Sequence, residues 1–140
     1  MGLILCATRG GEASYRTQQA AIALAKERGD EIVFLYVIDL RFLDKTAAPI
    51  VVDIEGELEQ MGLFFLLMAK ERATEHDVKV RTITRKGVVQ DEIINAARDE
   101  GATLVVLGLP AGKRSAFETS SLQAFAAKIE RETDAETILF

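Results

Sequence analysis

The sequence ATLVVLGLPAGKRSAFETSSL, residues 102–122, joins a short apolar run to a loop that contains two glycines. The run from Leu104 to Leu107 is typical of a strand that is buried on both faces of a parallel sheet. Gly108 ends this run, and Lys113 and Arg114 add positive charge to the loop that follows. A glycine-bearing loop after a strand lets backbone N–H groups approach a phosphate closely, so this loop indicates an anion site.

Three hydroxyl residues, Thr119, Ser120 and Ser121, follow the loop and open a second apolar-periodic segment. Ser and Thr are favoured at helix N-termini, where free N–H groups and the positive end of the helix dipole attract anions. We therefore expect these hydroxyls to cap a helix that runs over 119–131 and to complete the phosphate-holding loop.

Apolar runs alternate with amphipathic segments along the whole chain. We expect strands over 3–7, 31–38, 78–84, 103–107 and 137–140, helices from a cap at Ser14 to near Gly29 and over 53–76, 88–100 and 119–131, and an irregular connection over 39–52. Strands that alternate with helices predict an α/β fold, a Rossmann-like open five-stranded parallel sheet with helices on both faces. The chain has 140 residues, so we expect one domain over 1–140.

The composition excludes several classes of function. The formal net charge is −5, which argues against a nucleic-acid-binding protein because such proteins need a basic surface. The chain has no apolar run long enough for a membrane span and no basic, apolar leader, so we expect a cytoplasmic protein that binds no membrane. One cysteine and one histidine offer neither a disulfide framework nor a histidine-rich metal site, and we predict no metal.

Four segments, taken in order, resemble the universal stress protein family over nearly the whole chain. They are CATRGGEAS at 6–14, LYVID at 35–39, Gly87 with Glu92, Ile93 and Ala96 behind it, and ATLVVLG at 102–108. The resemblance implies the strand order 3-2-1-4-5 and a homodimer that forms through the last strand, here from Thr137 to Phe140. It also implies that a nucleotide, ATP in many members, binds between the first and fourth strands.

The expected ligand site therefore lies at the C-terminal edge of the first and fourth strands. For a nucleotide or another small anion we assign Ala7, Thr8, Arg9, Val37, Gly108, Gly112, Lys113, Arg114, Ser120 and Ser121, and we assign no catalytic residue.

The chain departs from the family's ATP motif at three places. Ala111 replaces the second glycine of G-x-x-G, Ser120 and Ser121 replace the distal glycine–serine pair, and Arg9 replaces an aspartate. Side chains now occupy positions where the backbone should approach phosphate, and one charge is reversed. The cofactor is therefore left unknown, with ATP as one candidate for a degenerate motif.

Charged residues in the loops at the same edge favour an anionic ligand, because their sum is positive in an acidic protein. The residues counted are Arg9, Arg41, Lys45, Arg85, Lys86, Lys113 and Arg114 against Glu12, Asp39, Asp44 and Glu118.

The run from Leu63 to Met68 is apolar at six consecutive positions inside an expected helix. One stripe of this helix should face the sheet, so Leu63, Phe64 or Leu67 should point elsewhere. We interpret this surface as a homodimer or complex interface. The alternative is that the connection over 39–52 folds across it.

These observations support two hypotheses of different kinds, and a third that ranks below them. The first is a regulatory binding module, similar to universal stress proteins, for an adenine nucleotide or another small anion. The alternative is a dimeric scaffold that does not bind ATP and acts through protein–protein contacts. An enzyme that hydrolyses ATP or transfers a group from it ranks last, because no obvious aspartate is left to hold a phosphate-bound magnesium ion.

The loop at 9–14 also resembles that of ATP pyrophosphatases, but Arg9 and Ala13 replace key residues of their S-G-G-x-D-S motif.

Overall fold

The computed structural model describes residues 2–9, 11–39, 48–108 and 116–140. Its elements follow one another as β1 (Leu3–Ala7), α1 (Gly11–Arg28), β2 (Glu31–Ile38), α2 (Ala48–Glu75), β3 (Val80–Lys86), α3 (Val89–Glu100), β4 (Leu104–Leu107), α4 (Ala116–Glu132) and β5 (Glu136–Leu139). The alternation of strands and helices predicted from the sequence is confirmed.

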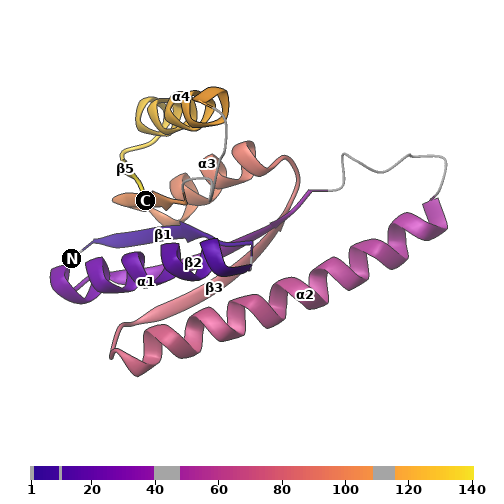
Figure 1. Ribbon diagram of the computed structural model, residues 1–140, viewed down its shortest axis with the longest axis horizontal. Coiled ribbons are helices and arrows are strands. Elements are labelled where there is room, and N and C mark those ends of the chain that lie inside the picture. Colours follow the sequence, from indigo (N-terminus) through magenta and orange to yellow (C-terminus); the bar gives the residue numbers. More distant parts are fainter. Residues whose placement is uncertain (1, 10, 40–47, 109–115) are drawn as a thin grey trace.

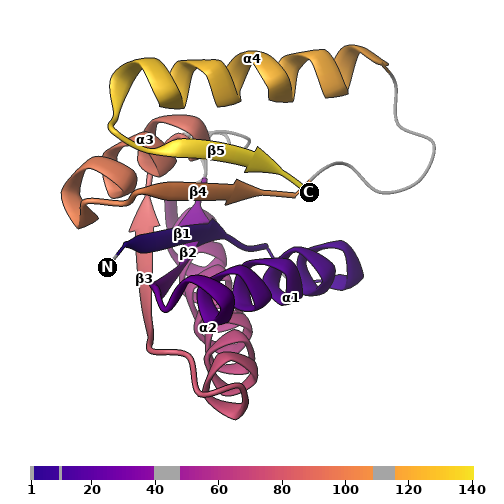
Figure 2. The same ribbon diagram turned by 90° about the vertical axis from the view of Figure 1, so that its left-hand side faces the viewer.

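The five strands form one parallel sheet in the order β3-β2-β1-β4-β5. α1 and α2 cover one face and α3 and α4 cover the other, as Figures 1 and 2 show. The predicted fold class and strand order are therefore confirmed. β3 lies at an edge of the sheet, and most of its residues are half-buried, as the alternating sequence predicts.

The core has two layers because each central strand sends alternate side chains to opposite faces of the sheet. Ile4 and Cys6 of β1 pack on the α1–α2 side, whereas Leu5 packs on the α3–α4 side. All three side chains are fully buried. The uninterrupted apolar run of β1 thus follows from burial on both faces.

Two helices begin earlier than the sequence suggests. α1 begins at Gly11, so the prediction of Ser14 as its cap is wrong; Ser14 Oγ instead accepts a hydrogen bond from the Arg9 N–H at 3.2 Å. α2 begins at Ala48 and takes in part of the expected irregular connection. Pro49 is compatible with this start, because proline fits the first turn of a helix, where its missing N–H costs nothing.

The turn between α2 and β3 places the third strand two residues later than predicted. Asp77 adopts a left-handed conformation with φ of 60°, and the Val78 N–H donates to Ala73 O at 3.1 Å. Val78 is consequently buried as part of the turn, and strand pairing starts at Val80 opposite Ile32.

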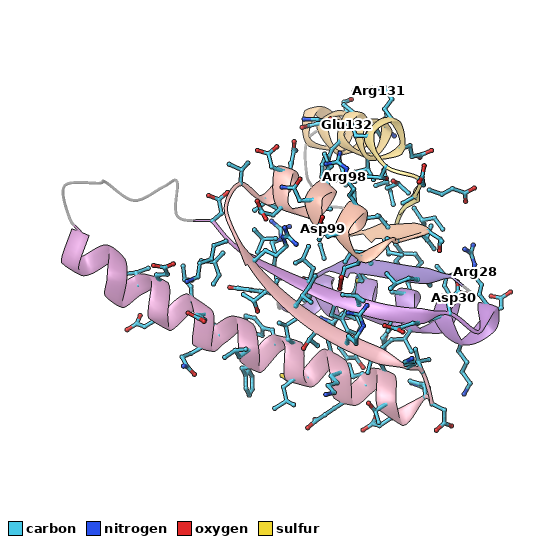
Figure 3. The ribbon with its side chains drawn as sticks, turned by 180° about the vertical axis from the view of Figure 1, so that it is seen from behind. Arg28, Asp30, Arg98, Asp99, Arg131 and Glu132 are labelled. Carbon is cyan, nitrogen blue, oxygen red and sulfur yellow. The ribbon has the colours of Figure 1, made fainter. Side chains whose placement is uncertain are left out.

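At the N-terminal edge of the sheet, where the strands begin, polar contacts join neighbouring segments. Arg98 on α3 donates to Glu132 O at the end of α4, at 3.1 Å, and Figure 3 shows these two residues near each other at the top of the view. The Gly2 N–H donates to Asp30 Oδ1 at 2.8 Å. α3 ends at Gly101, whose φ of 68° is the left-handed conformation that glycine adopts without strain. Within the described residues, no helix is both long and apolar enough to cross a membrane.

Candidate functional site

A cavity of about 240 Å³ lies where β1 and β4 end, on the α3–α4 side of the sheet. β1 pairs with β2 on one side and with β4 on the other, so the strand order reverses at this point. Parallel α/β sheets bind ligands in the crevice beyond such a reversal. The lining residues are Ala7, Thr8, Arg9, Leu35, Val37, Val89, Gln90, Ile93, Leu107, Gly108, Leu122 and Phe125.

Five of the ten residues assigned to the site from the sequence line this one cavity: Ala7, Thr8, Arg9, Val37 and Gly108. They come from the ends of three different strands, which the parallel arrangement brings to one edge. Gly112, Lys113 and Arg114 lie outside the described residues.

Ser120 and Ser121 are exposed and do not line the cavity. α4 begins at Ala116, so both serines lie beyond its first four residues, and the prediction that hydroxyls at 119–121 cap this helix is wrong. Backbone N–H groups beyond the first turn bond within the helix and cannot hold a ligand. Leu122, the next residue, does line the cavity.

The apolar wall that α3 and α4 form over the cavity was not predicted from the sequence. Ile93 and Phe125 are buried there. Both lie on helices that were expected from the sequence, but nothing in the sequence separates core positions from cavity-lining ones. Gln90, an exposed polar residue on α3, had no sequence signal at all.

The backbone around Thr8 is held firmly. The Thr8 N–H donates to Leu35 O at 2.8 Å, which extends the β1–β2 pairing by one residue. The Thr8 side chain is only 2% exposed, and its Oγ1 accepts a hydrogen bond of 2.6 Å from Gln18 Nε2 on α1. Arg9, by contrast, is exposed at the rim.

Gly108 is required by the close approach of β4 to α1. A Cβ atom at this position would lie 2.6 Å from Thr17 Oγ1. A side chain would therefore push α1 or the end of β4 away, and the cavity would change shape with them.

The positive charge expected at this edge is partly neutralised in the structure. Arg85 pairs with Glu92 at 2.8 Å and with Asp99 at 3.2 Å, and the hydrogen bond to Glu92 is the main cause that raises its pKa. Lys86 pairs with Glu55 at 2.9 Å. The β3 end of the edge thus contributes less free positive charge than the sequence count suggests. Among the described residues that line the cavity, Arg9 is the charged one.

The family model described as the universal stress protein family matches residues 1–138. The chain belongs to the universal stress protein family. It is 32% identical over 113 residues to the universal stress protein YxiE of Bacillus subtilis, covering 75% of this chain and 76% of that protein.

Solved universal stress proteins share the fold at low sequence identity. One is a universal stress protein in complex with cAMP, with a TM-score of 0.72, 18% identity and coverage of 99% of this chain and 96% of that one. Another is a family protein from Arabidopsis thaliana with AMP bound, with a TM-score of 0.69, 13% identity and coverage of 100% and 91%.

Proposed function

We propose that this universal stress protein is a regulatory binding module that takes an adenine nucleotide or another small anion in the cavity between β1 and β4. The observation that carries the proposal is the meeting of Thr8, Arg9, Val37 and Gly108 around one cavity at the reversal of strand order. The described lining is mostly apolar and includes a few polar or charged residues, Thr8, Arg9 and Gln90. This division suits a flat base against the apolar wall and an anionic group near Arg9.

Structural neighbours support an adenine nucleotide as the ligand class, because family members have been solved with cAMP and with AMP. The described cavity, at about 240 Å³, lies below the ~300–1,000 Å³ typical of drug-sized ligands. Within the described cavity, a nucleoside monophosphate therefore fits better than the larger triphosphate ATP. We place ATP hydrolysis below binding, because none of the described residues that line the cavity carries a carboxylate.

Calorimetric titration with AMP, cAMP, ADP, ATP and inorganic phosphate tests the proposal. In Arg9→Gln we expect the affinity for AMP to fall about 10- to 100-fold, the value of one hydrogen bond to a charged group. Arg28→Gln is the matched control, since it removes the same charge at the opposite edge of the sheet (Figure 3). If Arg9→Gln binds AMP as tightly as the unaltered protein does, Arg9 does not contact the ligand. If none of these compounds binds to the unaltered protein, the proposed binding module is refuted.

A dimeric scaffold that acts through protein–protein contacts is the second candidate, and an exposed apolar surface on α2 favours it. Met61, Leu63, Phe64 and Leu67 are 48–60% exposed, whereas Leu66 faces the sheet at 2%. The sequence prediction that part of this run points away from the sheet is therefore confirmed. We propose a cytoplasmic homodimer of single-domain chains, formed through the edge strand from Thr137 to Phe140, through the surface from Leu63 to Met68, or through both.

A further inference from the structure

The outer side of α2 carries an apolar patch, which we call the α2 patch: Met61, Leu63, Phe64 and Leu67. These side chains are 48–60% exposed, and they lie three or four residues apart, so they are neighbours on the helix surface. In Figure 1, α2 lies on the outside of the sheet, and no other described helix or strand lies beyond it. A contiguous exposed apolar patch indicates a surface for another molecule.

Three carboxylates lie on the same line of the helix as Phe64. Glu57 and Glu71 are seven residues before and after Phe64, and Glu75 is eleven residues after it, and all three are exposed. Seven and eleven residues are close to two and three full helical turns, so these side chains leave the helix on the same side as Phe64. The α2 patch is therefore framed at both ends by negative charge, about 10 Å from its centre.

The cations near α2 do not neutralise this frame. Lys86 pairs with Glu55, at 2.9 Å. Arg72 is turned toward α1, where its Nη1 donates a hydrogen bond of 2.6 Å to Gln18 Oε1. Lys70 is exposed, but it lies about a third of a turn round the helix from the line of carboxylates. The outer line of α2 thus keeps its negative charge on both sides of the patch.

A second copy of α2 and a lipid surface both fit this arrangement poorly. Two copies paired in parallel would place Glu57 beside Glu57, and two copies paired antiparallel would place Glu57 beside Glu71, so like charges meet in both cases. Helices that lie on membranes carry basic residues around their apolar face, because anionic lipids repel carboxylates. The charge of α2 favours a partner that is apolar at its centre and basic at its flanks.

We propose that the α2 patch docks an amphipathic helix of another protein, with lysine or arginine on both sides of its apolar residues. The inference rests on the scaffold that is our second candidate function, and it deepens that candidate by naming the chemistry of the partner. Phe64 and Leu67 supply the apolar contact, as in other helices that bind to an apolar surface. Basic residues about two turns on either side of the partner's centre then reach Glu57 and Glu71.

Docking at the α2 patch is compatible with a homodimer. The inner side of α2, at Leu66 and Ala73, packs in one core layer with Tyr36 of β2 and Val80 of β3. β5 lies at the opposite edge of the sheet, and Figure 2 shows it well separated from α2. A homodimer formed through β5 therefore leaves one open patch on each copy, so the dimer holds two partner helices.

Two synthetic helical peptides test the charge of the partner. Both carry leucines three and four residues apart at their centre, and they differ only in having lysine or glutamate seven positions before and after the central leucine. In fluorescence anisotropy at low ionic strength, the lysine peptide should bind about tenfold or more tightly than the glutamate peptide, because ion pairs replace repulsions. Added salt should reduce this preference. Equal affinity for the two peptides, or no binding of either, overturns the proposal.

Substitutions on the protein show whether the peptide binds at α2. In Glu57→Lys/Glu71→Lys the preference should reverse in favour of the glutamate peptide. Glu130→Lys/Glu132→Lys is the matched control, since it makes the same change of charge at exposed positions of α4, on the other face of the sheet. Phe64→Ala should weaken binding of the lysine peptide about tenfold or more, the usual effect of truncating an aromatic anchor. A reversal of preference in the α4 variant as well would assign the effect to net charge and overturn the proposal.

Two further measurements separate this inference from the dimeric scaffold and from a lipid surface. If Phe64→Glu halves the mass of the protein in light scattering, the α2 patch is the homodimer interface, so the docking proposal fails and the dimeric scaffold stands. If the unaltered protein is a monomer that binds the lysine peptide, the dimer fails and the docking proposal stands. Binding to phosphatidylcholine vesicles that Phe64→Glu abolishes would assign the patch to a lipid surface and overturn the proposal.

Discussion

Cys6 lies in the middle of β1 and is fully buried. Burial raises the pKa of its thiol from 9.0 to about 12, because the apolar surroundings disfavour the thiolate. A thiol held in this way reacts slowly, since the thiolate is the reactive form. Cys6 therefore behaves as a small core residue of β1.

The raised pKa predicts a specific dependence of stability on pH. Between pH 9.0 and about 12 the unfolded chain loses the thiol proton while the folded chain keeps it. The free energy of unfolding should therefore fall as the pH rises through this range, by up to about 1.4 kcal/mol per pH unit from this group. Urea unfolding at pH 8, 9 and 10 measures the slope.

Cys6→Val supplies the control for that measurement. The variant keeps an apolar side chain of similar size in the strand, and its stability should fall less steeply above pH 9. Tyr36, whose pKa is also raised by burial, is present in both proteins and cancels in the comparison. Equal slopes in the two proteins would show that the Cys6 thiol ionises normally.

At the scale of one element, α2 approaches the sheet closely at Gly62, a helix position that has no side chain. A Cβ atom at Gly62 would meet the Tyr36 ring, with Cε1 of that ring only 2.6 Å away. Tyr36 in turn contacts the Phe65 ring, with 6.2 Å between the ring centroids. The close approach at Gly62 fixes the rotation of α2, so Leu66 faces the core and Phe64 faces outward.

Two alanine substitutions on α2 isolate this contact. Alanine favours a helix over glycine by about 1 kcal/mol, so Gly56→Ala, which meets nothing within 4 Å, should stabilise the protein slightly. Gly62→Ala should instead lower the free energy of unfolding by about 1–3 kcal/mol, because the added methyl group overpacks against Tyr36. Chemical unfolding monitored by circular dichroism measures both. A gain of stability in both variants would mean that Tyr36 moves aside without cost.

For the whole molecule, periodicity predicted the elements and the parallel sheet, whereas the family resemblance supplied the strand order and the candidate site residues, five of which line the cavity. The sheet follows from runs such as Leu104 to Leu107, whose burial on both faces leaves a clear pattern in the sequence. The helix starts were less predictable because a nearby hydroxyl, such as Ser14, has uses other than a cap. The bond between Gln18 and Arg72 joins residues 54 positions apart, and no local pattern marks such a pair.

The two candidate dimer surfaces are not equally suited to self-association. On α2, the exposed apolar surface is flanked along the helix by Glu57 and Glu71, each seven residues from Phe64. Two copies of the helix that paired antiparallel about Phe64 would place these carboxylates opposite one another, which is unfavourable. β5 instead pairs only with β4 among the described strands and has an open edge of backbone groups. We therefore expect the homodimer to form through β5.

Thr137→Pro tests this expectation, because it removes one backbone donor from the open edge. The N–H groups of Glu136 and Phe140 donate to Thr103 O and Leu107 O across the β4 side, so strand alternation points the Thr137 N–H outward. The variant should keep its far-ultraviolet circular dichroism spectrum. Its mass in light scattering should fall from that of a dimer to that of one chain, 15.4 kDa. Thr137→Val, which lacks the same hydroxyl but retains the N–H, should stay dimeric. If Phe64→Glu rather than Thr137→Pro halves the mass, the dimer forms through α2 and the β5 assignment is wrong.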